Sequence, residues 1–326
     1  MTSILAVEKL QIIQILTLDA RASYATMAAV LGVSEQTAAR RFQALIRDGV
    51  VRCRAWLDHR TLGQSQWILR VTPAGSGTKL AEALSLHPAM SWVSMTDTEV
   101  VCFYQPQSAA DSDTMLADRI RTTSLVESMD ARQILRRFPL RTSWPDLAWT
   151  LDVTQQTRLR ELADSSFAVD RHGDTPTRSA DVLSAEDKAL IGLIVRDPRT
   201  PYSHLGRSTG MTRARIATRV GALTEAGILR FDIEVDPDRI GLRTSAVLWV
   251  EVALERLEAV GLALGRLSEI QFVCATTGTT GLFATISARD TVHLYELMTR
   301  DIAPIEGIRS VEVRTYLRTP RAQPLP

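Results

Sequence analysis

The chain contains two related stretches of sequence, YATMAAVLGVSEQTAARRFQALIRDGV at residues 24–50 and YSHLGRSTGMTRARIATRVGALTEAGI at residues 202–228. The correspondence extends without a gap from residues 8–63 to residues 186–241, at a constant offset of 178 positions. The matched positions include turn glycines and charged residues: Asp19 and Asp197, Arg21 and Arg199, Gly32 and Gly210, Arg41 and Arg219, and Gly49 and Gly227. A repeat of this length, with its glycines in register, indicates two copies of one folding unit.

Each copy begins with two predicted helices separated from a third by a sharp turn. The second helix is short, at residues 24–31 in the first copy and 202–209 in the second. Gly32 and Gly210 follow it, where the chain must adopt a positive φ that glycine tolerates best. The first helix is predicted from apolar residues at helical spacing: Ile12, Ile13 and Leu16 in one copy, and Leu190, Ile191 and Ile194 in the other.

The third helix is predicted at residues 34–46 and 212–223. Ser34 and Thr212 are suitable N-caps, because a hydroxyl can accept a hydrogen bond from a free amide of the first turn. Gly49 and Gly227 end these helices, and a short strand is expected directly after each glycine. The predicted buried faces are Ala38, Phe42 and Leu45 in one copy, and Ile216, Val220 and Leu223 in the other. This order is typical of a winged-type helix–turn–helix.

The opposite face of each third helix is polar and basic. Arginine and glutamine can read base edges, and arginine, serine and threonine bind phosphates. A solvated helix surface explains any single arginine equally well, and Arg41 and Arg219 could instead pack along the core edge. Because the whole set occurs twice, the predicted DNA-contacting residues are Ser34, Gln36, Thr37, Arg40, Arg41, Thr212, Arg213, Arg215, Thr218 and Arg219.

Beyond each helix–turn–helix the pattern changes to the order βαββαβ, which predicts a ferredoxin-like domain. In the second copy the predicted strands are residues 245–252, 270–275, 281–287 and 311–317, with helices marked by Leu257 to Leu264 and Leu294 to Met298. In the first copy the predicted strands are residues 65–71, 90–95, 100–104 and 126–135, with helices at 79–85 and 115–120. The fold class is therefore α+β.

In this order of domains the sequence resembles the Lrp/AsnC family of transcriptional regulators. The resemblance rests on Asp197-Pro-Arg-Thr, on Arg219-Val-Gly-Ala-Leu in the third helix, on Gly227-Ile-Leu-Arg, and on the spacing from Asp236 to Gly241. It implies a regulator that binds double-stranded DNA in a sequence-specific manner and is modulated by an amino acid or another small metabolite. Family members usually carry one such unit, so this chain resembles a tandem fusion of two.

The resemblance also implies an effector site near the loop between the second and third strands of the ferredoxin-like domain. In the second copy this loop supplies the predicted ligand-binding residues Thr276, Thr277, Gly278, Thr279 and Thr280. Glycine lets a ligand approach the backbone, and the hydroxyls suit a small carboxylate or amino group. The family usually has an acidic residue here, which this loop lacks, and a plain threonine-rich turn is an equal alternative. The first copy's loop, residues 96–99, lacks both glycines.

These patterns divide the chain into five segments. The predicted domains are residues 1–63 and 186–241 for the two helix–turn–helix units, 64–138 and 242–320 for the two effector domains, and 139–185 for a linker. A short helix is expected at residues 154–163 of the linker, with Leu159 and Leu162 on one side. The effector domains could pair within one chain or between chains, and a homo-oligomer through these domains is expected.

The composition is that of a protein of the cytoplasm. The net charge is +1, so any basic footprint for DNA must be local. Three separated cysteines (Cys53, Cys102 and Cys274) indicate a reducing compartment and small buried side chains. Neither a secretory signal nor a run of about 18 apolar residues is found, so no membrane association is expected.

No enzyme, metal site or cofactor is predicted. The five histidines are scattered, and the chain has no nucleophile or phosphate-binding motif. Siroheme decarboxylases also resemble Lrp/AsnC proteins, but they place histidines around the second and third strands of the effector domain. Here the corresponding strands, at residues 90–95, 100–104, 270–275 and 281–287, contain none. Such an enzyme remains the alternative, together with a ligand-sensing protein that has lost DNA binding.

Overall fold

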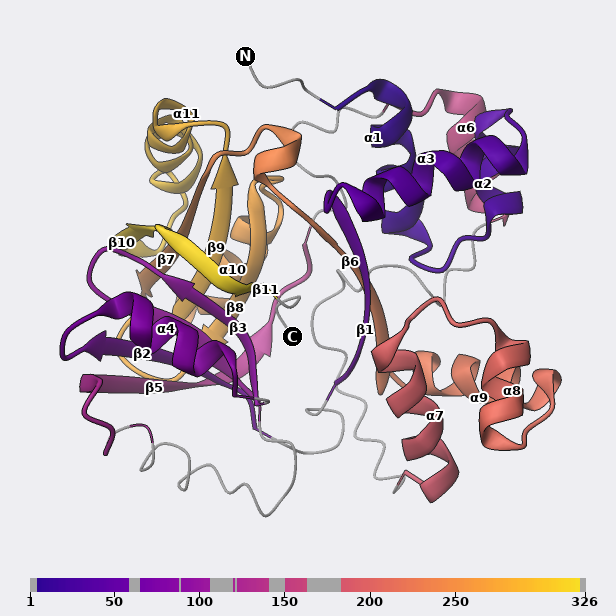
Figure 1. Cartoon of the computed structure of the whole chain (residues 1–326). Helices are drawn as coiled ribbons and strands as arrows, with labels where there is room; N and C mark the ends of the chain where they lie inside the picture. The colour runs from indigo at the N-terminus through magenta and orange to yellow at the C-terminus, as the bar shows by residue number, and fades with distance from the viewer. Residues whose placement is uncertain are drawn as a thin grey trace. The chain divides into compact units, whose positions relative to one another are not determined.

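The computed structural model describes residues 5–58, 65–87, 89–105, 120, 122–140, 150–162 and 183–322. The chain folds into two compact units, and each unit draws on both sequence repeats (Figure 1). One, here called the helical unit, comprises residues 1–62, 143–170 and 175–241. The other, the sheet unit, comprises residues 63–142, 171–174 and 242–326. Like elements from the two repeats are therefore grouped together.

The helical unit contains both predicted three-helix arrangements. Those of the first copy are α1 (Val7–Leu18), α2 (Tyr24–Leu31) and α3 (Glu35–Arg47), followed by β1 (Val51–Leu57). Those of the second copy are α7 (Ala185–Arg196), α8 (Tyr202–Thr209) and α9 (Arg213–Glu225), followed by β6 (Leu229–Val235) and the short 3-10 helix η2 (Asp238–Ile240). Both second helices have the predicted bounds, and the predicted buried faces of α3 and α9 are buried.

The turns before α3 and α9 also agree with the sequence prediction. Gly32 and Gly210 are left-handed, with φ of 66° and 73°. Ser34 accepts a hydrogen bond of 3.2 Å from the amide of Thr37, and Thr212 accepts one of 3.2 Å from the amide of Arg215. These caps satisfy amides that have no partner within the helix, so the local sequence is sufficient to start each third helix.

The strand that follows each helix–turn–helix pairs with the equivalent strand of the other copy. The strands β1 and β6 are antiparallel, with Val51 opposite Val235 and Arg54 opposite Asp232. Since Arg54 and Asp232 are also equivalent in the repeat, a pseudo-twofold axis passes through this pair. The two helix–turn–helix copies thus form a pseudo-dimer within one chain.

Two equivalent arginines complete this pairing. Arg21 donates to the carbonyl of Thr200 at 3.1 Å and lies over the Tyr202 ring, 4.8 Å from its centroid. In return, Arg199 donates to the carbonyls of Ala20 and Ala22 at 3.0 and 2.6 Å. Each copy thereby supplies a guanidinium to the helix turn of the other.

The helix predicted in the linker packs on the first copy. It is α6 (Val153–Leu162), and it contacts α2. The side-chain oxygen of Gln14 accepts hydrogen bonds from the amides of Thr150 and Leu151, which fixes the approach to α6. Leu159 is fully buried, whereas Leu162, three residues further along the helix, is 44% exposed. The rest of the predicted linker lies mostly outside the described residues.

The sheet unit contains two βαββ arrangements with their closing strands. The first has β2 (Trp67–Pro73), α4 (Gly77–Ser85), β3 (Met90–Met95), β4 (Val100–Tyr104) and β5 (Val126–Arg137). The second has β7 (Thr244–Val252), η3 (Leu254–Arg256), α10 (Leu257–Gly265), β8 (Ile270–Thr276), β9 (Leu282–Ala288), α11 (Thr291–Glu296), the π-helical turn η4 (Leu297–Ile302), β10 (Ile308–Thr315) and β11 (Arg318–Ala322). The helix predicted at residues 115–120 lies outside the described residues except for Ile120.

One prediction for the second copy needs correction. A single last strand was expected at residues 311–317, but β10 spans Ile308–Thr315 and a separate strand, β11, follows at Arg318–Ala322. The amide of Tyr316 still donates to the carbonyl of Ser245, whereas the amide of Leu317 donates to the carbonyl of Met95 in the first copy. The chain therefore changes pairing partner at this point, which alternation of side chains cannot reveal.

Both last strands cross from one copy to the other. The strand order is β10-β7-β9-β8-β5-β2-β4-β3-β11. The first part of β5 pairs with β2 of its own copy, and Ile134 to Arg137 pair with β8 of the other. In the same way β11 pairs with β3. The effector domains are therefore paired within the chain, as the helix–turn–helix units are.

Within its described residues the sheet unit has three apolar clusters. One joins α10 and α11 to their sheet, and a second joins α4 to the first copy's sheet. The third lies where the two copies meet and is rich in aromatic rings, including Trp92, Phe103, Trp249, Phe272 and Phe283. No helix within the described residues is long and apolar enough to cross a membrane.

Candidate nucleic-acid interface and ligand site

The polar face of α3 is largely exposed. Gln36 and Arg40 are exposed, and Thr37 and Arg41 are half-buried. Ser34 is exposed but engaged as the N-cap, with its hydroxyl also 2.9 Å from that of Thr37. This face therefore presents amide, hydroxyl and guanidinium groups at the start of the helix, which are the groups that contact bases and phosphates in a major groove.

The corresponding face of α9 has a different environment. Arg213 and Thr218 are exposed, and Thr212 is the N-cap. Arg215 donates to Glu186 at 2.6 Å, and Arg219 donates to Asp187 through both Nε and Nη2, the latter at 2.7 Å. An open pocket separates the start of α7 from α9 and is lined by Ser184, Glu186, Asp187, Met211, Arg215, Thr218, Arg219 and Ala222.

Asp187 has two roles in this arrangement. It forms a capping box with Ser184, whose hydroxyl accepts from the Asp187 amide at 3.1 Å and whose amide donates to the carboxylate at 3.0 Å. The hydrogen bonds from Arg219, together with those from Ser184, lower the pKa of Asp187 from 3.8 to about 2. Sequence reasoning overlooked this residue, although the spacing Ser184-x-x-Asp187 is a recognisable helix-start signal.

The loop between β8 and β9 contains the five predicted ligand-binding residues. Thr277, Gly278 and Thr279 are exposed, Thr280 is half-buried and Thr276 is buried. The hydroxyl of Thr276 has no hydrogen-bond partner in the part of the chain that the structure describes. Gly278 has a φ of 98°, so glycine is required there for conformational reasons. The structure thus brings the five together in one turn, in which residues 277–279 are exposed.

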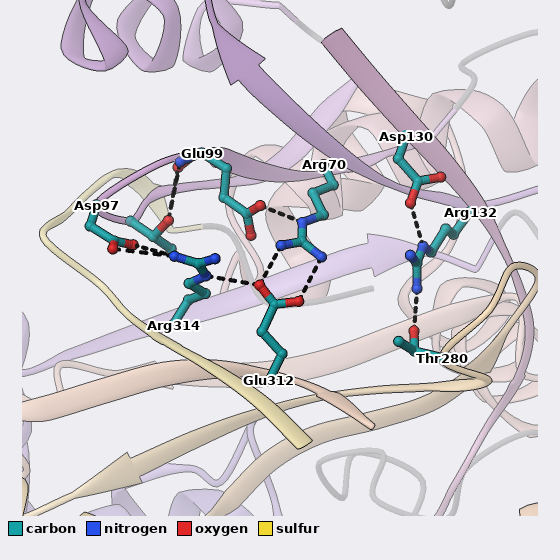
Figure 2. A network of polar contacts seen from close by, with 9 residues as sticks. Arg70, Asp97, Glu99, Asp130, Arg132, Thr280, Glu312 and Arg314 are labelled. Carbon is teal, nitrogen blue, oxygen red and sulfur yellow. Dashed lines mark hydrogen bonds and ion pairs between the residues drawn. The ribbon is translucent and has the colours of Figure 1, made fainter. Parts of the chain in front are cut away.

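The same loop is attached to β5 of the first copy. Thr277 exchanges two hydrogen bonds with the backbone of Gln133, at 2.9 and 3.0 Å. Thr280 accepts a hydrogen bond from Arg132, whose guanidinium also donates to Asp130 at 2.7 Å (Figure 2). A side chain at position 278 would lie 3.3 Å from Arg132 Nε. The loop therefore borders the contact between the two effector domains.

An equivalent attachment exists on the other side of the pseudo-dimer. Arg314 on β10 donates to Asp97 of the β3–β4 loop at 3.3 Å and to Glu312 at 2.9 Å (Figure 2). The pair Glu312 and Arg314 has the same spacing on its strand as Asp130 and Arg132. In each copy, the loop between the second and third strands thus contacts an arginine of the other copy, from β5 in one case and from β10 in the other.

The two sides differ at Arg70. It bridges Glu99 and Glu312, donating to both oxygens of Glu312 at 2.9 and 2.6 Å (Figure 2). Its guanidinium also lies over Trp249, 5.2 Å from the centroid. The hydrogen bonds from Arg70 lower the pKa of Glu312. The second carboxylate oxygen of the buried Glu99 has no hydrogen-bond partner among the described residues. Sequence reasoning missed this network, because its residues are far apart in the chain.

In the described ranges, no group of three or more histidine, cysteine, aspartate or glutamate side chains is placed to hold a metal ion. His59 and His172 lie outside these ranges. Cys102 and Cys274 are buried and Cys53 is half-buried. Burial raises the pKa of Cys102 to about 12, so this thiol is not ionised near neutral pH.

Comparison with known protein families agrees with this geometry. Residues 10–46 match the AsnC-type helix-turn-helix domain, and residues 186–230 match a winged helix-turn-helix DNA-binding domain. Residues 245–326 match the Lrp/AsnC ligand binding domain. The chain belongs to the Lrp/AsnC family. It is a DNA-binding regulator of that family, with the helix–turn–helix present twice.

Curated relatives of this Lrp/AsnC protein correspond to one of its two copies. The HTH-type transcriptional regulator LrpA of Pyrococcus horikoshii is 25% identical over 131 residues, which are 40% of this chain and 93% of LrpA. The HTH-type transcriptional regulator Ptr1 of Methanocaldococcus jannaschii is 24% identical over 139 residues, which are 42% of this chain and 94% of Ptr1.

Solved structures resemble either one copy or the whole chain. Escherichia coli AsnC has a TM-score of 0.41 at 22% identity and covers 44% of this chain and 98% of its own. The siroheme decarboxylase NirDL has a TM-score of 0.59 at 17% identity and covers 96% of this chain and 91% of its own. The second likeness concerns the fold alone, and it extends over both copies.

Proposed function

We propose that this Lrp/AsnC protein binds an asymmetric operator through α3 and α9, and that a small metabolite bound at the β8–β9 loop modulates the binding. One observation carries the proposal: two capped third helices with basic faces are joined in one chain by the β1–β6 ribbon. A pseudo-dimer of this kind can place two helices in successive major grooves, as two-subunit regulators do.

The asymmetry follows from the residues at equivalent positions. Gln36 of α3 corresponds to Ala214 of α9, and Arg40 corresponds to Thr218. Glutamine and arginine can each form two hydrogen bonds to a base edge, whereas alanine and threonine offer mainly methyl contacts or one hydroxyl. The two third helices would therefore read different half-sites, and a palindromic operator is not expected.

The ligand would be an amino acid or a related metabolite held by the backbone and hydroxyls of residues 276–280. Because Thr277 and Thr280 also bind β5, a ligand that competes for these groups would change the contact between the two effector domains. It regulates DNA binding only if it has unequal affinity for the two arrangements. We further propose homo-oligomer formation through the effector domains, with the protein acting in the cytoplasm on chromosomal DNA.

The proposal is tested by titrating the purified full-length protein with duplex DNA from its own upstream region at several salt concentrations. Saturable binding that weakens steeply with salt, and that exceeds binding to a scrambled duplex, is the expected result. Amino acids are then added one at a time, and at least one should shift the midpoint. Absence of specific binding would contradict the proposal, and a protein that purifies with a tetrapyrrole absorption band would favour an enzyme related in function to the siroheme decarboxylases.

A further inference from the structure

The two copies differ at the start of the first helix, opposite the third helix. Asp187 in the second copy corresponds to Lys9 in the first, and the cap Ser184 corresponds to Ala6. The arginine facing this position is retained in both copies, as Arg219 and Arg41. In the second copy the arginine therefore faces a carboxylate, whereas the equivalent position in the first copy carries an amine.

We propose that these two equivalent arginines have diverged in role: Arg41 contacts DNA, whereas Arg219 holds α9 against α7. It follows that α3 makes the larger contribution to operator affinity. This inference rests on the proposed function, because it concerns how much each of the two third helices contributes to DNA binding.

The contacts of Arg219 make it a poor DNA ligand. Asp187 occupies Nε and Nη2, the two donors on one edge of the guanidinium fork that would otherwise bind a phosphate or a guanine in the same bidentate way. The Asp187 side chain is only 4% exposed. Turning Arg219 toward DNA would therefore leave a buried carboxylate without its cation, close to the phosphates.

Arg41 has no such partner among the described residues. The ion pairs of this region of the first copy join Lys9 to Asp48 at 3.1 Å, and Arg47 to the same Asp48 at 3.3 Å. N-cap Ala6 has no capping side chain. Because Lys9 is already paired with Asp48, Arg41 is the arginine that brings an uncompensated positive charge to this edge of α3 within the described residues, and a phosphate can neutralise it.

The remaining polar residues of α9 are consistent with a weaker contact. Arg215, which stands where α3 has Thr37, donates to Glu186 at 2.6 Å, although both side chains are more than half exposed. Arg213 and Thr218 stay exposed at the start of the helix. This copy keeps groups for phosphate contacts, while two of its three arginines are paired with carboxylates of α7.

The repeat supplies the matched variants for a test in the full-length protein. R41A and R219A remove the same side chain at equivalent positions. We expect R41A to weaken operator binding about tenfold and to reduce the salt slope by about one, with an unchanged urea midpoint. We expect R219A to leave affinity within about twofold and to lower the urea midpoint. Equal losses of affinity, or the reverse pattern, would overturn the inference.

A second set of variants places an aspartate at position 9 of the first copy, where the second copy has Asp187. K9D should weaken binding more than K9A, because the introduced carboxylate can pair with Arg41. The double variant K9D/R41A should bind like R41A alone, since the introduced carboxylate then has no arginine to occupy. If the losses of binding free energy caused by K9D and R41A were additive in the double variant, the introduced carboxylate would act by general repulsion of DNA. That result would contradict the local mechanism. If the wild-type protein binds no duplex specifically, the proposed function itself has failed; the stability difference between R41A and R219A is measured independently of DNA.

Discussion

Asp187 shows how one side chain can serve both helix initiation and packing. Its carboxylate completes the capping box of α7 and receives the guanidinium of Arg219 from α9. The first copy has neither interaction, because Ala6 and Lys9 occupy the equivalent positions. The first helix therefore begins and ends at equivalent residues in the two copies, although different side-chain interactions stabilise it.

The lowered pKa of Asp187 predicts a pH-dependent stability. With a pKa of about 2 in the folded state and 3.8 as its ordinary value, the carboxylate contributes stability that is fully present above pH 4 and is lost as the pH falls toward 2. The contribution is about 1 kcal/mol after allowance for Arg219, which is 41% exposed. In urea unfolding, D187N should be less stable than wild type at pH 6, and the two should converge near pH 2. A constant difference over this range would contradict the assignment.

At the scale of elements, the β1–β6 ribbon favours pairing of unlike copies. Arg54 lies opposite Asp232 on the pseudo-twofold axis and donates a hydrogen bond to Glu234. Glu234 also forms an ion pair with Arg52, with 3.7 Å between the charged groups. The same register between two β1 strands would place Arg54 opposite Arg54, and between two β6 strands Asp232 opposite Asp232. Like charges directly opposite one another destabilise a strand pair. The charges on the ribbon therefore favour the pairing of β1 with β6 over the pairing of either strand with a second strand of its own kind.

The contribution of this ion pair can be measured by a double-mutant cycle. R54A and E234A should each lower the free energy of unfolding of the helical unit, and the double variant should lose less than the sum. We expect a coupling of about 1 kcal/mol, since both side chains are about four-fifths buried but the pair is close to solvent. The measurement is urea unfolding followed by helical circular dichroism. Fully additive losses would show that Arg54 and Glu234 do not stabilise each other.

In the molecule as a whole, equivalent elements of the two copies pair within the chain. The β1–β6 ribbon joins the helix–turn–helix copies, and the crossing strands β5 and β11 join the effector domains. When a folded regulator consists of two separate chains, its stability against unfolding rises with protein concentration. Contacts within a single chain do not depend on concentration in this way. A single chain therefore has the contacts that otherwise require two subunits.

The corresponding prediction concerns concentration. The urea midpoint of the full-length protein should stay constant when the protein is diluted about a hundredfold, because unfolding breaks no interchain contact needed for the pairing. Circular dichroism at high concentration and tryptophan fluorescence at low concentration cover the range. A midpoint that rises with protein concentration would show that the proposed homo-oligomer contributes to the stability of the fold.

Most elements and their order follow from local signals in the sequence. Gly32, Gly210, Ser34 and Thr212 specify the turns and caps through their own backbone preferences, so α2, α8 and the starts of α3 and α9 were predictable. The strands β3 and β4 also have the bounds expected from the sequence. All of these signals are local, and each acts within a few residues.

Tertiary structure alone decided which elements meet. The pairing of β1 with β6, the switch of partner between β10 and β11, and the docking of α6 beside Gln14 depend on residues more than a hundred positions apart. The same holds for the availability of the predicted DNA-contacting residues: Arg41 and Arg219 are equivalent in sequence, yet among the described residues only Arg219 has an aspartate to hold it. A local pattern specifies what a side chain can do, and the charges brought beside it by folding decide what it does.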